Sequence, residues 1–450
     1  MTGRSIAALL SRLLMAISCV SVIPPALGAP REVVERIATL IDNNYFDATK
    51  ARQIAEDLRA AAQAGRFDTL VDPRDLAAGL TVRLQPLDHH FLVTWSPPAP
   101  APAQTKTAAT AGAGAETVPE MSLEESQRRS GYGFRRVEML PGAIGYIAMS
   151  VFADFSFAKP DEPARRAADA ALELVSSADA VILDLRDNGG GSPTMVGYIV
   201  SAFTAPNTNI YNSFRHRDSN DSEHPKESYP SPRPEVPLFV LISGRSASAA
   251  ESTAYTLQAA KRAIIVGEAS AGASNPGGDF PAGDGFAIFV STATAINPIT
   301  GTNWESVGVK PDVAVDPRKA LEVAERLAFE KILARNAHAA EPTAGLVETR
   351  WMLEALRAKE SSPAGPPLTD YVGTYSGATL SLANGQLALH RGRRPPWPLL
   401  RVHDDVFFVR DEPFRRVFFQ RNAARRVNRF ELVRAGGPSS WFARIPGSPP

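Results

Sequence analysis

Residues 132–320 alternate short apolar runs with stretches of helical periodicity, and this alternation constrains the fold more than any other feature of the chain. The predicted strands are 143–149, 180–185, 237–242 and 263–266, and the predicted helices between them are 162–175, 195–203 and 247–261. Strands that alternate with helices over short connections favour a mainly parallel sheet covered by helices. The polar, proline-rich segment 207–235 interrupts the pattern and is predicted to be a surface excursion near a functional site.

The segments before this region predict a separate N-terminal domain over residues 30–95. Helical spacing is found in 32–43, 49–65 and 72–79, and a strand pattern follows at 91–95. Residues 96–119 are mainly Pro, Ala, Thr and Gly, a composition that predicts a flexible linker because it offers little apolar surface to bury. The core domain is then predicted to span residues 120–320.

Two further units are predicted after the core domain. A helical connector over 321–365 carries two helical patterns, the second from Val347 to Glu360, and ends in a Ser- and Pro-rich boundary. Residues 366–450 consist of short alternating segments separated by turn residues, which predicts a small antiparallel β-domain without a catalytic constellation. The fold class is therefore α/β, with an N-terminal helical cap and a C-terminal β-domain.

Composition excludes several classes of protein. The chain has 450 residues, 44% of them hydrophobic, which is enough for several cores and excludes disorder as the main state. Its 48 basic and 48 acidic side chains argue against a dedicated nucleic-acid binder. The single cysteine, Cys19, excludes a disulfide framework.

The first 28 residues have the order of a secretory signal. Arg4 and Arg12 precede the uncharged run 13–23, and the small-residue tripeptide 26–28 follows, so cleavage is predicted after Gly28. The run is shorter than the roughly 20 residues of a membrane-spanning helix. Export to the periplasm or the medium is therefore predicted. The alternatives are a lipid anchor on Cys19 or a buried helix, which the two prolines at 24–25 would break.

A glycine turn follows the buried strand at 180–185. The sequence Asp187-Asn188-Gly189-Gly190-Gly191 frees the backbone for positive φ and for close approach to a ligand. Such a turn can present N–H groups to a phosphate or to the oxyanion of an acyl-transfer intermediate. Neither a Walker loop nor a dinucleotide fingerprint is present, and a plain tight turn is the alternative.

Ser248 lies between a predicted strand and a predicted helix, surrounded by small residues. A serine at such a turn has the geometry of a nucleophile, with helix N–H groups nearby to support an oxyanion. The alternative is that Ser246 or Ser248 only caps the helix.

His89 and His90 are the only adjacent pair among seven histidines. A histidine is the general base that a serine nucleophile requires. A metal site is disfavoured because the mature chain has no cysteine and no H-x-x-x-H spacing. A surface pair without a role is the other alternative.

Taken together, these motifs resemble the C-terminal processing (tail-specific) protease superfamily, in the branch of tricorn and the interphotoreceptor retinoid-binding protein modules. The resemblance covers about residues 31–320. It rests on the motifs Leu183-Asp184-Leu185-Arg186 with the glycine turn, Ser248-Ala249-Ala250-Glu251, Val266-Gly267-Glu268, and Trp304-Glu305 with Gly308-Val309-Lys310-Pro311-Asp312. It implies a ClpP/crotonase-like core.

The resemblance also implies residue roles. Ser248 would be the nucleophile, and the oxyanion hole would be formed by backbone N–H groups of Gly190, Gly191 and Ala249. The lysine of the processing-protease branch is replaced by Ala273, which excludes a Ser–Lys dyad.

In the tricorn-like branch the base is a histidine supported by a glutamate. These roles fall on His90 and Glu305, with a solvated loop carboxylate as the alternative for Glu305. His89 stands where tricorn has a serine that links the two, so His89 is a possible intermediary. Ser306 departs from the glycine that is usual in the family.

The function implied is a serine-type endopeptidase that acts on a peptide or protein substrate without a metal or cofactor. The main alternative is a binding module for an apolar ligand or a peptide on the same fold, and a third is an adaptor that uses the β-domain. No segment suggests a PDZ domain, so selection for free C-termini is not expected. Because base and nucleophile lie on opposite sides of the linker, we hypothesise that activity depends on closure of the N-terminal domain.

Overall fold

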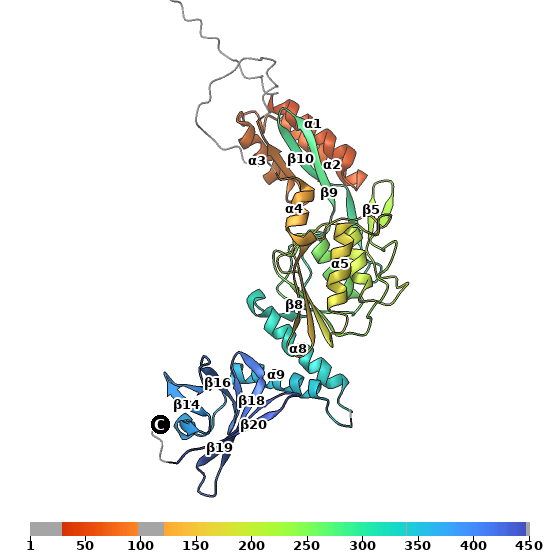
Figure 1. Cartoon of the computed structure of the whole chain (residues 1–450). Coiled ribbons are helices and arrows are strands. Elements are labelled where there is room, and N and C mark those ends of the chain that lie inside the picture. Colours follow the sequence, from red (N-terminus) through yellow and green to blue (C-terminus); the bar gives the residue numbers. More distant parts are fainter. Residues whose placement is uncertain (1–28, 98–120, 339, 447–450) are drawn as a thin grey trace, which may run out of the picture.

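The computed structural model describes residues 29–97, 121–338 and 340–446. These residues form a helical N-terminal unit, an α/β core and a C-terminal β-domain, which follow one another along an elongated molecule (Figure 1). The predicted signal sequence with Cys19, and nearly all of the predicted linker, lie outside the described residues. Among the described helices, none combines the length and apolar character needed to span a bilayer.

The core is built on a six-stranded sheet, and a mainly parallel arrangement is confirmed. The strand order is β12-β8-β7-β4-β3-β2, with parallel pairing everywhere except between β3 and β2. The strands are β2 (Phe134–Leu140), β3 (Ile144–Met149), β4 (Ala180–Asp184), β7 (Leu238–Ile242), β8 (Ile264–Gly267) and β12 (Val313–Ala314). Every residue of β4 and β7 is buried, as expected when both faces of a parallel sheet are covered.

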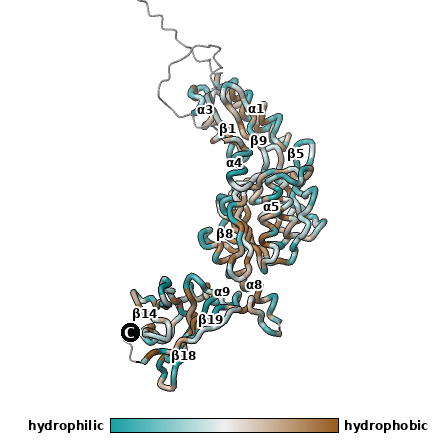
Figure 2. Tube along the Cα trace, in the orientation of Figure 1, coloured by the Kyte–Doolittle hydropathy of each residue, from teal (hydrophilic) through white to brown (hydrophobic). Residues whose placement is uncertain are grey.

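Helices cover the two faces of this sheet. Leu183 and Val240 pack in one apolar cluster with α5 (Pro163–Leu174), α6 (Pro193–Ser201) and α7 (Ala249–Ala259). Ile182 and Phe239 pack on the opposite face against α8 (Ala320–Arg335) and α9 (Ala344–Ser361). Successive residues of a strand point to opposite faces of the sheet, and both faces are covered by helices. The residues of these strands are therefore almost all apolar, which explains the continuous apolar runs in the sequence. Figure 2 shows these hydrophobic stretches running through the core.

The segment 207–235 is only partly the surface excursion that its polar composition predicts. Its strands β5 (Ser213–His216) and β6 (Asn220–Ser222) form a small sheet with β11 (Ala293–Ile296). Asn212 and Glu223 are buried because they hydrogen-bond each other and Ser252 of α7. These polar groups satisfy one another's hydrogen bonds, so this part of the segment can be buried in the core. Composition alone does not reveal such pairing.

The N-terminal unit is completed by a hairpin from much later in the chain. It contains α1 (Pro30–Asn44), α2 (Ala48–Gln63), α3 (Pro73–Leu84) and β1 (Leu92–Trp95). Strand β1 pairs antiparallel with β10 (Phe286–Ser291), which pairs with β9 (Gly277–Gly283). Phe286, Ile288 and Val290 of this hairpin pack in the same apolar cluster as the helices. Any closing movement of this unit would therefore carry the hairpin with it.

We expect Ile288→Ala to destabilise the protein by about 2–5 kcal/mol, because it leaves a cavity where the hairpin meets the helices. Ile288 is fully buried in this cluster. Urea unfolding of both proteins measures the loss. Ile299→Ala is the matched control, since Ile299 is 49% exposed, and it should change the free energy of unfolding little. Equal effects of the two substitutions would contradict the packing described.

The C-terminal unit is an eight-stranded antiparallel barrel, so the predicted β-domain is confirmed. Its strands are hydrogen-bonded in chain order. They are β13 (Gly373–Tyr375), β14 (Ala378–Ala383), β15 (Gln386–His390), β16 (Trp397–His403), β17 (Val406–Val409), β18 (Glu412–Arg421), β19 (Val427–Arg434) and β20 (Ser439–Ala443). The first and last strands are joined by the bonds Ser376 N–Ala443 O (2.8 Å) and Ile445 N–Thr374 O (2.9 Å). Buried aromatic rings fill the interior.

The remaining short elements are the helix α4 (Leu123–Arg129) and three 3₁₀ turns, Gly131–Gly133, Pro317–Lys319 and Leu368–Tyr371.

Candidate active site

Ser248 lies at the turn from β7 into α7 and has an unusual backbone conformation. Its φ is 53° and its ψ is −116°, a region that costs a non-glycine residue about 1–3 kcal/mol. Strain of this kind persists where the surrounding structure holds a reactive side chain in place. The hydroxyl of the neighbouring Ser246 is buried, accepting from Ser243 N and donating to Leu185 O. Ser246 therefore anchors the turn and is not a helix cap.

The glycine turn lies directly against Ser248. A Cβ atom added to Gly190 would stand 2.8 Å from the Cβ of Ser248 and 3.2 Å from its Oγ, so only glycine allows this approach. The φ angles of Gly190 and Gly191, 116° and 132°, also favour glycine. The structure therefore brings the predicted nucleophile and the glycine turn together.

Of the three N–H groups predicted to form an oxyanion hole, that of Gly190 has a hydrogen-bond partner within the protein. The Gly190 N–H donates to Oδ1 of Asn188 at 2.9 Å, so this donor is already used. Among the hydrogen bonds of the described residues, none uses the N–H of Gly191 or Ala249. Those two groups remain available for an oxyanion, while Gly190 provides the space that Ser248 needs.

Glu251, in the first turn of α7, connects the nucleophile to the loop 270–273. This fully buried carboxylate accepts from the backbone N–H of Ser248 at 2.8 Å. It also accepts from the Ser270 hydroxyl (2.6 Å), from Gly272 N (2.6 Å) and from Ala273 N (2.8 Å). No role was predicted for Glu251, although its position three residues after a potential N-cap is the signature of a capping box.

His90 lies between two carboxylates. Its Nδ1 is 3.1 Å from Oδ1 of Asp88 and 3.3 Å from Oε1 of Glu305. The other oxygen of Glu305 accepts from the backbone N–H groups of Ser274 and Asn275 at 2.9 and 3.1 Å. Glu305 is thus a positioned residue at the junction of the N-terminal unit and the core, and not a solvated loop carboxylate.

His89 does not take the intermediary position considered from the sequence. Its side chain is exposed, and among the described residues it forms no hydrogen bond with His90 or Glu305. Asp88 contacts the ring instead, and its carboxylate also accepts from the backbone N–H of His90 at 2.9 Å. Asp88 is the first residue of the Asp-x-His pattern on which the assignment of His90 rests, but no role of its own was predicted for it.

The two carboxylates dominate the electrostatics of His90. Burial alone would lower the pKa of His90, but hydrogen bonds to Asp88 and Glu305 and their charges outweigh it and raise the pKa to about 10. In the same cluster, burial would raise the pKa of Glu305 and of Asp88, but the hydrogen bonds from His90 lower both. His90 is therefore an imidazolium at neutral pH in this arrangement.

The same three side chains are those that could hold a metal ion. One donor atom from each of Asp88, His90 and Glu305 lies within 4.8 Å of the others. The hydrogen bond of Nδ1 to Asp88 and its ion pair with Glu305 describe the same cluster as a histidine held by two acids, an arrangement that suits a general base.

The loop 270–275 joins the two halves of the site. Its residues 272 and 273 donate to Glu251, next to Ser248, and its residues 274 and 275 donate to Glu305, next to His90. Among the described residues, no hydrogen bond joins the Ser248 hydroxyl to His90. Catalytic hydrogen bonds of this kind are often long before a substrate binds.

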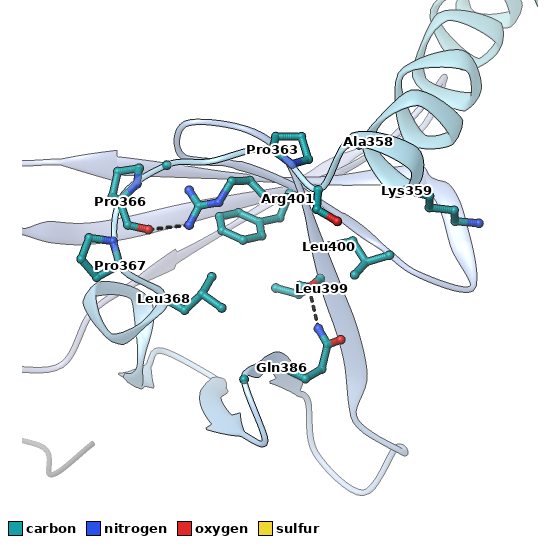
Figure 3. A pocket seen from close by; sticks show the side chains of 14 residues that line it. Ala358, Lys359, Pro363, Pro366, Pro367, Leu368, Gln386, Leu399, Leu400 and Arg401 are labelled. Carbon is teal, nitrogen blue, oxygen red and sulfur yellow. Dashed lines mark hydrogen bonds between the residues drawn. The ribbon is translucent and has the colours of Figure 1, made fainter.

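Two cavities are relevant to the position of a substrate. One, of about 630 Å³, begins beside the glycine turn at Pro193 and Thr194 and is also lined by Phe155, Phe157 and His224. The other, of about 500 Å³, lies between the end of α9 and the β-domain, where Pro363, Leu368 and Arg401 line it (Figure 3). Only the first lies beside the glycine turn, and Ser248, His90 and Glu305 line neither cavity.

Comparisons with known proteins indicate the family to which this chain is similar. Residues 143–315 match the model of peptidase family S41, and residues 22–130 match the N-terminal domain of peptidase S41 in eukaryotic IRBP. The matched family and its IRBP-type N-terminal domain are those that the sequence resemblance predicted.

Two curated relatives have similar core sequences. The carboxy-terminal-processing protease of Bartonella bacilliformis is 32% identical over 181 residues, which are 39% of this chain and 39% of the relative. The chloroplastic carboxyl-terminal-processing peptidase 2 of Arabidopsis thaliana is 31% identical over 183 residues, which are 38% of this chain and 33% of the relative. The matches thus cover between a third and two fifths of these relatives.

Among solved structures, a photosystem II D1 C-terminal processing protease aligns with a TM-score of 0.43 and 19% identity. The alignment covers 67% of this chain and 97% of that one.

Proposed function

We propose that the protein is a serine endopeptidase in which Ser248 is the nucleophile and His90 the general base. The observation that carries the proposal is the strained Ser248 turn, packed against Gly190 and connected through one loop to the His90–Glu305 contact. The match to family S41 supports the reaction class, and the relatives are named as carboxy-terminal-processing proteases. The substrate class proposed is a peptide or protein.

The mechanism follows from which atoms are engaged. Nδ1 of His90 faces the two carboxylates, so Nε2 is the nitrogen left for Ser248. Nε2 takes the hydroxyl proton as Ser248 Oγ bonds to the peptide carbonyl carbon. The N–H groups of Gly191 and Ala249 donate to the oxyanion, an interaction worth about 3 kcal/mol per donor in comparable sites. His90 then protonates the leaving amine as the C–N bond breaks, and water hydrolyses the acyl-enzyme.

Covalent labelling with a fluorophosphonate, together with release of peptides from an unfolded protein such as casein, tests this proposal. We expect the wild type to be labelled once per chain and to release peptides. If the folded protein does neither, the proposal fails. A binding module is the second candidate, favoured by the absence of a Ser248–His90 hydrogen bond among the described residues. It would bind peptides or apolar ligands without cleaving them.

The pH dependence of the reaction provides a sharper prediction. Only the neutral form of His90 accepts a proton, and its pKa is raised to about 10. We therefore expect kcat/KM to keep rising with pH well above 6.5, the usual pKa of histidine. Asp88→Asn removes one of the two charges that favour the imidazolium, so the rise should move to lower pH. The measurement is kcat/KM from acidic to strongly alkaline pH.

A matched control for the pH experiment is Asp75→Asn, which removes an exposed carboxylate from helix α3 of the same unit. It should keep the wild-type profile. If Asp88→Asn also keeps that profile, Asp88 does not set the pKa of the base.

We also propose that the protein acts outside the cytoplasm. The support is the signal-like order of residues 1–28, which lie outside the described part of the chain.

A further inference from the structure

The charges of this nearly neutral chain are unevenly distributed. Residues 366–450 contain thirteen arginines, no lysine and six acidic side chains, so this region carries a strong positive charge. Since the whole chain has equal numbers of basic and acidic residues, the remainder carries a matching negative charge. A domain that uses arginine alone for its positive charge is suited to oxyanions, because the planar guanidinium binds them through two parallel N–H donors.

The topology of the barrel gathers many of these arginines at one end. All neighbouring strands are antiparallel, so alternate turns lie at the same end of the barrel. One end is formed by the turns 376–377, 391–396, 410–411 and 435–438, and we call it the arginine mouth. The arginines in these turns or within four residues of them are Arg391, Arg393, Arg394, Arg410, Arg415 and Arg434.

Carboxylates neutralise only part of the arginine mouth. Glu412 pairs with Arg415, and Asp411 lies 3.5 Å from Arg410. Within the described part of the chain, no acidic side chain forms an ion pair with Arg391, Arg393 or Arg394, and the last two are exposed. A concentration of uncompensated positive charge is therefore held at this end.

The structure holds the guanidinium groups close together. The Arg391 guanidinium carbon lies 5.9 Å from the ring centre of Trp397 and 5.1 Å from that of Phe442, and Arg415 lies 5.3 Å from Trp397. Burial and the charges of Arg394 and Arg415 lower the pKa of Arg391. These aromatic contacts order the guanidinium groups of Arg391 and Arg415, although the two groups repel each other. A bound anion would relieve this repulsion.

We propose that the arginine mouth binds a soluble polyanion with closely spaced phosphate groups. The ligand lies on the surface of the mouth and not within the barrel, because buried aromatic rings fill the interior. A membrane surface fits less well. Trp397 is only partly exposed, and Trp441, three residues beyond the turn 435–438, is the single large exposed apolar side chain near the mouth among the described residues. One aromatic side chain provides far less apolar surface than an interfacial helix buries in a membrane.

The test measures binding of linear inorganic polyphosphate to the full chain as a function of salt concentration. The variant is Arg393→Asn with Arg394→Asn in the arginine mouth. Its matched control is Arg425→Asn with Arg426→Asn, the exposed adjacent pair in the turn at the opposite end. Asparagine is used because Arg425 has a φ of 58°. Thermal unfolding of each variant verifies that the barrel is intact.

We expect wild type and control to bind alike, and the mouth variant to bind at least about tenfold more weakly. The slope of log affinity against log salt concentration should fall by about one to two, since each lost phosphate contact removes roughly 0.7. Equal losses in both variants, or no binding at low salt, would overturn the proposal. Binding to vesicles that contain phosphatidylglycerol, without binding to polyphosphate, would also overturn it and indicate a membrane partner. The readout is independent of peptidase activity.

Discussion

Ser248→Ala is expected to abolish fluorophosphonate labelling and to reduce peptide hydrolysis by at least about 10³-fold, the scale of losing a serine nucleophile. The fold should be unaffected, because the substitution removes a single hydroxyl. The backbone N–H of residue 248 would still donate to Glu251, so the turn remains anchored. Labelling and hydrolysis are measured beside thermal unfolding.

The matched control for Ser248 is Ser231→Ala. Ser231 is an exposed serine whose side chain forms no hydrogen bond among the described residues. We expect this variant to keep full labelling and activity. Residual labelling of Ser248→Ala at the wild-type rate would place the nucleophile elsewhere and refute the proposed mechanism.

His90→Ala is expected to reduce kcat by roughly 10²–10⁴-fold, the usual contribution of a positioned general base. Labelling by the fluorophosphonate should slow in parallel, since the same base activates Ser248 for both reactions. Because the loss concerns proton transfer and not substrate binding, KM should change much less than kcat. Steady-state kinetics and labelling rates provide the measurement.

His89→Ala serves as the control for His90, because the two residues are adjacent but His89 is exposed and outside the cluster of carboxylates. It should retain wild-type kinetics. If His89→Ala is the damaging substitution and His90→Ala is not, the base has been assigned to the wrong ring.

Much of the architecture could be predicted because periodicity depends on local burial. The buried strands 180–185 and 237–242 are continuous apolar runs since helices cover both faces of the sheet, and the structure has them at nearly these bounds. The short alternating segments of the β-domain were recognisable for a similar reason, because one side of each strand faces a filled interior.

The contacts that complete the site could not be predicted, because they join residues far apart in the sequence. Nothing local indicates that Phe286 and Ile288 belong to the core of the N-terminal unit. Whether Asp88 or His89 contacts the ring of His90 depends on how the chain turns before β1. The hydrogen bond from the Gly190 N–H to Asn188 depends on the rotamer of Asn188. Residue identities therefore indicated the candidates, while their pairings required the tertiary structure.

The segregation of charge was hidden for a different reason. A total of 48 basic and 48 acidic residues is neutral whether the charges are mixed or separated. Composition speaks against a dedicated nucleic-acid binder only for the whole chain and does not describe the surface of a single domain.

The pairing of β1 with β10 has a consequence for biosynthesis. Residues 30–95 leave the ribosome or translocon first, yet the hairpin that completes their core ends only at Ser291. Contacts separated by about two hundred residues form late, so a nascent chain exposes this unfinished apolar surface for much of its synthesis. His90 and Glu305 also meet only after that point. A chain that ends before Glu305 would therefore have no assembled site, and the proposed activity would arise only after that residue has been made.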